Sequence, residues 1–98
     1  MKDEEPAEEH KLVLPKGNEV IGRVTKATGA ANFMVLCSDN YERLCTIPGR
    51  LKRLFWVKEG DIVLVKPWIV QTNERGDIIW RYSIMDRDEL KKRGYNIP

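Results

Sequence analysis

Short runs dominated by apolar and β-branched residues recur along the chain and are separated by turn-forming residues. Runs of this kind predict strands, which we place at residues 20–25, 32–37, 41–47, 62–65 and 77–82. The turn at 38–40 contains Asp and Asn, so the second and third strands are expected to form a hairpin. A polar loop at 71–76 precedes the fifth strand. Gly22 lies inside the first run, which indicates a bend or the close approach of another backbone.

The five predicted strands would leave long apolar sheet edges unless the sheet closes on itself. After the third strand, Pro48 and Gly49 end the run, and Leu51, Leu54 and Phe55 follow at the i, i+3, i+4 spacing of a short helix that would bury them. We therefore predict an all-β fold with small helical additions. It is a five-stranded Greek-key OB-fold barrel with a short helix between strands 3 and 4 and a short C-terminal helix.

The expected C-terminal helix carries local start and stop signals. Asp86 is a good N-cap, and Glu89 three residues later would complete a capping box. Met85 and Leu90 have the spacing of a hydrophobic staple around that cap. Gly94 follows a basic last turn and is expected at the position that ends the helix.

The 98 residues suit one domain, but charge divides them unevenly. Residues 1–10 hold one lysine and five acids, a net charge of −4, which leaves 16 basic and 10 acidic residues and a net charge of +6 for residues 11–98. We expect residues 1–16 to form a flexible acidic N-terminal arm, in which 12–14 are a candidate edge strand. Residues 17–84 would form the OB-fold RNA-binding domain, and 85–98 a short C-terminal helix and tail.

One stretch of the body, residues 43–58, contains five basic residues and no acid. A local field of one sign suits a polyanion such as a nucleic acid, and the alternative is an ordinary solvated face. Aromatic side chains add to this picture because bases stack on exposed rings. Trp56 and Trp68 each stand two residues from a lysine and are candidate contacts, whereas Phe33, Phe55 and Trp80 are expected mainly in the core.

Residues for catalysis or metal binding are sparse. The single histidine, His10, lies in the acidic segment, and the chain has neither a phosphate-binding glycine loop nor a paired-carboxylate motif. Cys37 and Cys45 lack zinc-site spacing and are expected to be reduced, largely buried thiols. No apolar run approaches the roughly 18 residues of a membrane span. We predict a protein that is not an enzyme, with no cofactor, no metal and no membrane partner.

Two longer segments resemble one known family. Residues 43–68, with their IPG turn, basic run, Trp-Val, EGD and Pro-Trp elements, and residues 76–82, which end in WRY, are similar to archaeal translation initiation factor 1A. The similarity extends from about Pro15 to Tyr95. It implies an OB-fold initiation factor, monomeric and cytoplasmic, that binds ribosomal RNA of the small subunit at the decoding centre in the A site.

The resemblance also implies partners and roles. Such a factor would promote initiator tRNA binding and start-site selection, together with initiation factor 1, the tRNA-carrying factor 2 and the subunit-joining GTPase. The residues matched to RNA contacts, with secondary candidates chosen from charge and strand placement, are Arg43, Arg50, Lys52, Arg53, Trp56, Lys58, Lys66 and Arg81. Two alternatives remain open from the residues themselves: a cold-shock-like protein that binds any single-stranded RNA, and a protein-interaction barrel.

Overall fold

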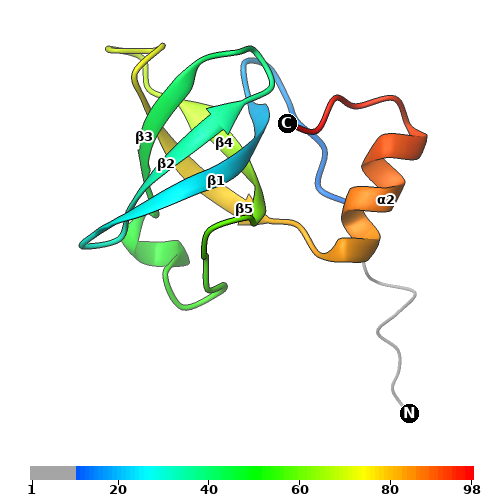
Figure 1. The fold of residues 1–98 in the computed structure, drawn as a ribbon, viewed down its shortest axis with the longest axis horizontal. Helices are drawn as coiled ribbons and strands as arrows, with labels where there is room; N and C mark the ends of the chain where they lie inside the picture. Colours follow the sequence, from blue (N-terminus) through cyan, green and yellow to red (C-terminus); the bar gives the residue numbers. More distant parts are fainter. Residues whose placement is uncertain (1–10) are drawn as a thin grey trace.

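The computed structural model describes residues 11–98, which form a β-barrel with a helix packed against one side (Figure 1). The elements are β1 (Val20–Gly29), β2 (Asn32–Cys37), β3 (Glu42–Thr46), the 3₁₀ helix η1 (Gly49–Leu51), β4 (Ile62–Pro67), β5 (Arg75–Arg81) and α2 (Ile84–Lys92). The expected acidic residues 1–10 lie outside the described part of the chain. All five predicted strands are present, most of them extended or shifted by a few residues.

The strands close in the order β1-β2-β3-β5-β4, and β4 pairs back onto β1. β3 and β5 pair in parallel, whereas the other neighbouring strands are antiparallel. This is the predicted five-stranded Greek-key barrel, and β2 and β3 form the expected hairpin. Gly22 is needed for closure: a Cβ there would collide with the Val35 side chain on β2, as expected for a strand glycine at a close approach.

The strand β4 is apolar on both faces because each face is covered. Val63 and Val65 point into the barrel and belong to its core, whereas Ile62 and Leu64 belong to a second cluster outside the barrel. That second cluster lies beneath α2 and includes the buried Leu90. A strand buried on both faces has a continuous apolar sequence instead of alternating apolar and polar residues. Residues 62–65 have this continuous apolar pattern.

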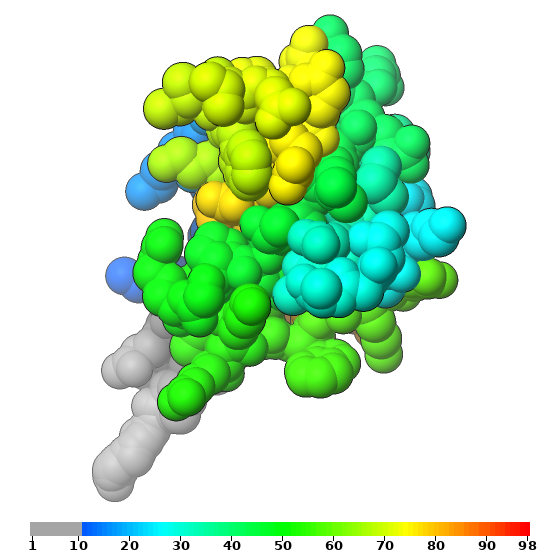
Figure 2. All heavy atoms as spheres, turned by 90° about the vertical axis from the view of Figure 1, so that its left-hand side faces the viewer, coloured from blue at the N-terminus to red at the C-terminus, as the bar shows by residue number. Residues whose placement is uncertain are grey.

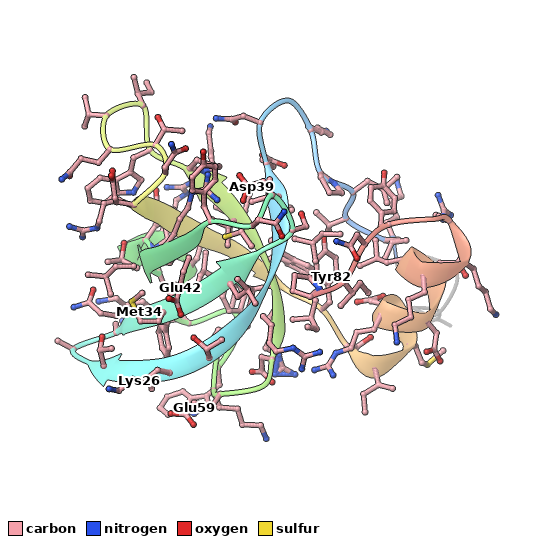
Figure 3. All side chains as sticks on the ribbon, turned by 45° about the horizontal axis from the view of Figure 1, so that its top comes forward. Lys26, Met34, Asp39, Glu42, Glu59 and Tyr82 are labelled. Atoms are coloured by element: carbon pink, nitrogen blue, oxygen red, sulfur yellow. The ribbon has the colours of Figure 1, made fainter. Side chains whose placement is uncertain are left out.

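Residues 11–19 run between the barrel and α2 (Figure 1), so part of the predicted flexible arm is packed. Leu12, Val13 and Leu14 are partly buried against the second cluster, but they form no strand. The Tyr82 hydroxyl, which lies between the barrel and α2 in Figure 3, donates a 2.6 Å hydrogen bond to the Val13 carbonyl. The C-terminal end returns to the barrel, where Arg23 Nε donates to the Pro98 carbonyl at 2.8 Å.

The start of the C-terminal helix differs from the prediction. Ser83 is the N-cap: its side chain accepts a hydrogen bond from the Asp86 backbone N–H, and the Asp86 carboxylate accepts from the Ser83 N–H. Asp86 is therefore the third residue of this capping box and not the cap. The predicted staple is also wrong, because Met85 is 81% exposed. The helix does end as expected, with Gly94 at φ +90° after it.

The helix predicted between the third and fourth strands is shorter than expected. It consists of the three-residue η1 followed by turns, and Leu54 is 64% exposed instead of buried. Leu51 and Phe55 do pack against the barrel core. Among residues 11–98, no helix has the length and apolar content needed to cross a membrane.

Candidate nucleic-acid interface

Three cations follow β3 on a short, well-bonded turn. Arg50, Lys52 and Arg53, which we call the basic turn, are all exposed, and none has an ion-pair partner among the described residues. Hydrogen bonds from Leu51 N to Pro48 O (2.8 Å) and from Leu54 N to Leu51 O (3.0 Å) hold the backbone. Because Leu51 is anchored in the core, the charged side chains on either side of it face solvent.

Trp56 stands next to the basic turn and projects from the protein. Its side chain is 82% exposed, whereas Val57 beside it is buried and Phe55 packs edge-on against Trp80, with 6.1 Å between ring centroids. The segment is extended, so successive side chains alternate between the core and solvent. The Trp56 backbone is also fixed, since its carbonyl accepts a 3.2 Å hydrogen bond from Arg81 Nη1. An exposed ring on a fixed backbone is a suitable platform for a base.

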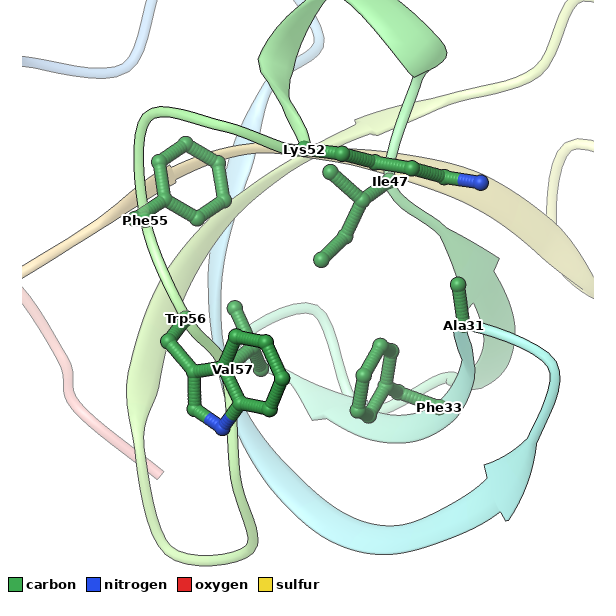
Figure 4. Close-up of a pocket in the computed structure, with 7 residues that line it drawn as sticks. All are labelled: Ala31, Phe33, Ile47, Lys52, Phe55, Trp56 and Val57. Carbon is green, nitrogen blue, oxygen red and sulfur yellow. The ribbon is translucent and has the colours of Figure 1, made fainter.

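A pocket of about 280 Å³ opens at this end of the barrel (Figure 4). Its walls are almost entirely apolar, and the Lys52 side chain extends along one edge. This lining suits a flat, weakly polar group with an anionic neighbour. The lining residues are Ala31, Phe33, Ile47, Lys52, Phe55, Trp56 and Val57.

Arg43 was predicted to contact RNA, but the structure corrects this, because its side chain is buried and fully used. Arg43 is 1% exposed. Its two terminal nitrogens donate to both carboxylate oxygens of Asp39, at 3.0 and 2.8 Å, and its Nε donates to the Thr72 carbonyl at 2.7 Å. The hydrogen bond from Arg43 lowers the pKa of Asp39. Burial is the largest single influence and by itself would lower the pKa of Arg43, but the hydrogen bonds and charges of Asp39 and Cys37 together outweigh burial and raise it.

The remaining predicted residues fall into two groups. Lys58 and Lys66 are exposed, and neither has an ion-pair partner in the described part of the chain. Lys66 and Arg50 both line a second pocket. Arg81 is half-buried and donates a hydrogen bond to the Trp56 carbonyl. Its main role is therefore to position Trp56, and its charge is less accessible than those of the lysines.

The loop between β4 and β5 contains surface features that the sequence analysis missed. Ile69 is 98% exposed and Val70 is 68% exposed. Their position two and three residues after Pro67, beyond the end of an apolar strand, was the available signal. Trp68, a candidate contact, is half-buried instead: its Nε1 donates to Asp77 at 3.0 Å, and the Arg75 guanidinium lies 4.4 Å from the centre of its ring.

The two cysteines are structural, as predicted. Cys37 and Cys45 are free and buried, with 1% and 0% exposure. Burial raises the pKa of both thiols, to about 12 for Cys45, so they stay protonated and unreactive near neutral pH. Among residues 11–98, no cluster of three or more His, Cys, Asp or Glu side chains is placed to hold a metal ion.

Comparisons with known proteins identify relatives of this chain. Residues 9–98 match the family described as translation initiation factor 1A / IF-1. The chain is 44% identical over 84 residues to translation initiation factor 1A of Pyrococcus abyssi, covering 86% of this chain and 74% of that protein. It is 43% identical over 94 residues to translation initiation factor 1A 1 of Haloquadratum walsbyi, covering 96% and 97%.

A solved structure also resembles the barrel. The solution structure of translation initiation factor IF-1 from the Wolbachia endosymbiont of Brugia malayi superposes with a TM-score of 0.54 at 34% sequence identity. The match covers 74% of this chain and 84% of that one. The likeness confirms the OB-fold prediction.

Proposed function

Because this chain belongs to the translation initiation factor 1A / IF-1 family, and so acts in translation initiation without being an enzyme, we propose that it works by binding RNA of the small ribosomal subunit. The proposed binding surface consists of the basic turn, Trp56 and Lys58. The observation that carries the proposal is an 82% exposed indole beside three cations that have no ion-pair partner among residues 11–98.

The chemistry of this surface suits irregular RNA. Arginine forks bind phosphates and stack on bases, which favours Arg50 and Arg53 for folded RNA with unpaired bases. A base stacked on Trp56 would contribute about 1–3 kcal/mol. The apolar pocket between Trp56 and Phe33 offers such a base a second wall. Phosphate contacts then supply affinity and orientation, whereas the ring selects unstacked nucleotides.

The finer role that we propose is binding at the decoding centre in the A site. From there the protein would promote initiator tRNA binding and start-site selection, as a cytoplasmic monomer. Companion factors would be initiation factor 1, the tRNA-carrying factor 2 and the subunit-joining GTPase. The family resemblance is the support for this placement, and the compact basic surface is consistent with it, because it is small enough to enter a confined RNA site.

The outer face of the β2–β3 hairpin argues against the cold-shock-like alternative. Such proteins display aromatic rings on these strands. Here Met34, Leu36 and Leu44 take the outward positions, and Glu42 lies beside them (Figure 3). This face has neither the aromatic rings nor the cations that non-specific single-strand binding requires. The same apolar strip keeps a protein-interaction role as the second candidate function.

The decisive experiment reverses the charge of the basic turn. The triple variant Arg50→Glu, Lys52→Glu, Arg53→Glu should lose binding to archaeal small ribosomal subunits by at least about 100-fold in co-sedimentation, while its circular dichroism spectrum stays unchanged. A matched control, Lys11→Glu, Lys16→Glu, Lys92→Glu, makes the same change in net charge at exposed lysines elsewhere. Equal loss in both variants, or loss in neither, would refute this surface.

A further inference from the structure

We propose that the β4–β5 loop, residues 68–74, forms with Arg50 and Lys66 a second RNA contact that holds one unstacked ribonucleotide. The proposal rests on the proposed function, because the nucleotide belongs to the same ribosomal RNA. It adds a site formed by apolar loop residues that lie outside the basic stretch of the sequence. In Figure 2 the yellow-green loop rises above the green segment of the basic turn, with a recess between them.

The recess is a pocket of about 400 Å³, large enough for a nucleotide. Its lining combines two cations, Arg50 and Lys66, with apolar side chains from the loop and from β5. Combined cationic and apolar walls match a nucleotide, which joins a phosphate to a sugar and a base. The lining residues are Arg50, Lys66, Pro67, Trp68, Ile69, Val70, Asp77 and Ile79.

The single carboxylate that lines this pocket does not cancel the positive charge of its lining. Asp77 Oδ1 already accepts hydrogen bonds from Trp68 Nε1 at 3.0 Å and from Thr46 Oγ1 at 3.2 Å. It forms no ion pair with either cation among residues 11–98. Two cations and one carboxylate leave the lining with a net charge of +1, and a phosphate is the anion that a polynucleotide would offer it.

The apolar tip is displayed by a well-bonded loop. The Thr72 hydroxyl lies 2.7 Å from the Trp68 carbonyl and 3.0 Å from the Ile69 carbonyl, and the Arg43 side chain holds the Thr72 carbonyl at 2.7 Å. Exposure of Ile69 and Val70 is thus a property of an ordered loop. Aliphatic side chains presented in this way act in nucleic-acid complexes as wedges against sugars and unstacked bases.

RNA is favoured over a protein partner because the pocket is continuous with the basic turn and because its lining is positively charged. Arg50 belongs both to the basic turn and to this pocket, so the two contacts share one surface. An RNA strand that contacts the basic turn can continue directly into the recess. A protein would need to supply a carboxylate for Arg50 and Lys66 together with an apolar patch for Ile69 and Val70. An RNA strand brings both chemistries in each nucleotide.

The first test compares two pairs of exposed apolar residues. Ile69→Ser with Val70→Ser should weaken binding to archaeal small subunits about 5-fold without changing the salt dependence. Lys66→Gln should weaken binding and lower the log–log salt slope by about one unit. The control is Ile84→Ser with Met85→Ser, an equally exposed apolar pair on α2, which should bind normally. Unchanged binding of both the Ile69/Val70 double variant and Lys66→Gln overturns the proposal, even where the charge-reversed basic turn has lost all binding.

The second test identifies what touches the loop. A photo-reactive benzoylphenylalanine at position 69 should crosslink to ribosomal RNA when the full-length protein is bound to small subunits and irradiated. The same probe at position 84 is the control and should give no RNA product. A crosslink from position 69 only to a ribosomal protein, or no crosslink at all, overturns the assignment to RNA. Loss of subunit binding in the charge-reversed triple variant tests the basic turn separately.

Discussion

Two regions whose arginines lie seven residues apart in sequence differ in burial and in bonding. At the start of β3, Arg43 is buried and makes three hydrogen bonds. In the basic turn after β3, Arg50 is exposed and has no ion-pair partner in the described part of the chain. One arginine holds the β2–β3 turn to the β4–β5 loop, and the other is available to a ligand. Charge density along the sequence therefore does not identify a binding surface by itself.

The difference has a simple structural cause. Arg43 occupies an inward position of β3, on the same face as Cys45, and it is kept charged there by Asp39 on the preceding turn. A buried cation requires such a partner. Among residues 11–98 no carboxylate forms an ion pair with the basic turn, and Leu51 anchors that turn to the core. Within this described part of the chain, water solvates these charges until an anion binds.

Matched alanine variants provide the strongest test of this contrast. Arg43→Ala should lower the free energy of unfolding by about 3 kcal/mol, because it removes a buried ion pair and the tie to Thr72. Arg50→Ala should change that free energy by less than about 0.5 kcal/mol. Urea unfolding followed by circular dichroism measures both. Equal destabilisation by the two substitutions would contradict the structural role assigned to Arg43.

Binding should show the reverse order. Trp56→Ala should weaken subunit binding about 10-fold, because a stacked base contributes about 1–3 kcal/mol. Trp56→Phe should recover most of that loss, since it keeps a ring at the same place. Neither substitution should lower the melting temperature, given the 82% exposure of the indole. Competition sedimentation with labelled wild-type protein measures the ratio, and a phenylalanine variant as weak as the alanine variant would argue against stacking.

The ion pair at Asp39 should also make stability depend on pH. The hydrogen bond from Arg43 lowers the pKa of Asp39 in the folded state. Below about pH 5, Asp39 binds protons more readily in the unfolded chain than in the folded one. The stabilisation from the ion pair is therefore fully present above that pH and is lost as pH falls through the lowered pKa of the folded state. Because Asp39 is 33% exposed, we expect only about 1 kcal/mol between pH 7 and pH 3.

The Asp39→Asn variant isolates this contribution. It removes the titrating group while keeping a hydrogen-bond acceptor of similar size, so its unfolding free energy should change less between the same two pH values. The difference between wild type and variant, measured by urea unfolding, reports Asp39 alone because the other carboxylates cancel. The same pH dependence in both proteins would show that Arg43 does not bind Asp39 in solution.

Local patterns predicted the barrel but not the environment of individual charges. Alternation and turn residues placed all five strands, and Gly22 correctly marked a close approach. The cap of α2 was misplaced because two motifs overlap, Ser83-x-x-Asp86 and Asp86-x-x-Glu89, and both satisfy the same spacing rule. Packing of Tyr82 and Leu90 against the barrel selects the earlier start.

In the candidate site, too, local patterns predicted some features and missed others. The spacing of the charged residues around Leu51 correctly predicted that the basic turn is exposed. Leu54 is also exposed, because the segment is a single 3₁₀ turn that cannot bury a second apolar side chain. Arg43 could have been recognised from strand alternation, which places it on the face of Cys45. The pocket beside Ile69 could not be predicted, because it joins Arg50 to a loop about 20 residues away through the parallel pairing of β3 with β5.

The smallest expected effect concerns the acidic segment and the basic turn. Residues 1–10 carry a net charge of −4 and are attached to a body of +6. We expect these acids to fold back transiently over the basic turn, because the two segments carry opposite charges. There they would compete weakly with phosphates, over a range limited to about 8 Å at physiological salt.

Deleting residues 1–10 should therefore strengthen binding to a non-specific single-stranded RNA by about 2- to 3-fold at low salt, and the gain should vanish at high salt. The melting temperature should stay nearly unchanged, because the residues that pack on the second cluster begin at Leu12. Titration of labelled RNA at two salt concentrations makes the measurement, with the charge-reversed basic turn as the control background. In that background the deletion should have no effect, because the acidic segment then has no cationic turn to occupy. Identical affinities of the full and shortened chains at low salt would contradict this prediction. They would mean that the acidic segment leaves the basic turn open to RNA at every salt concentration.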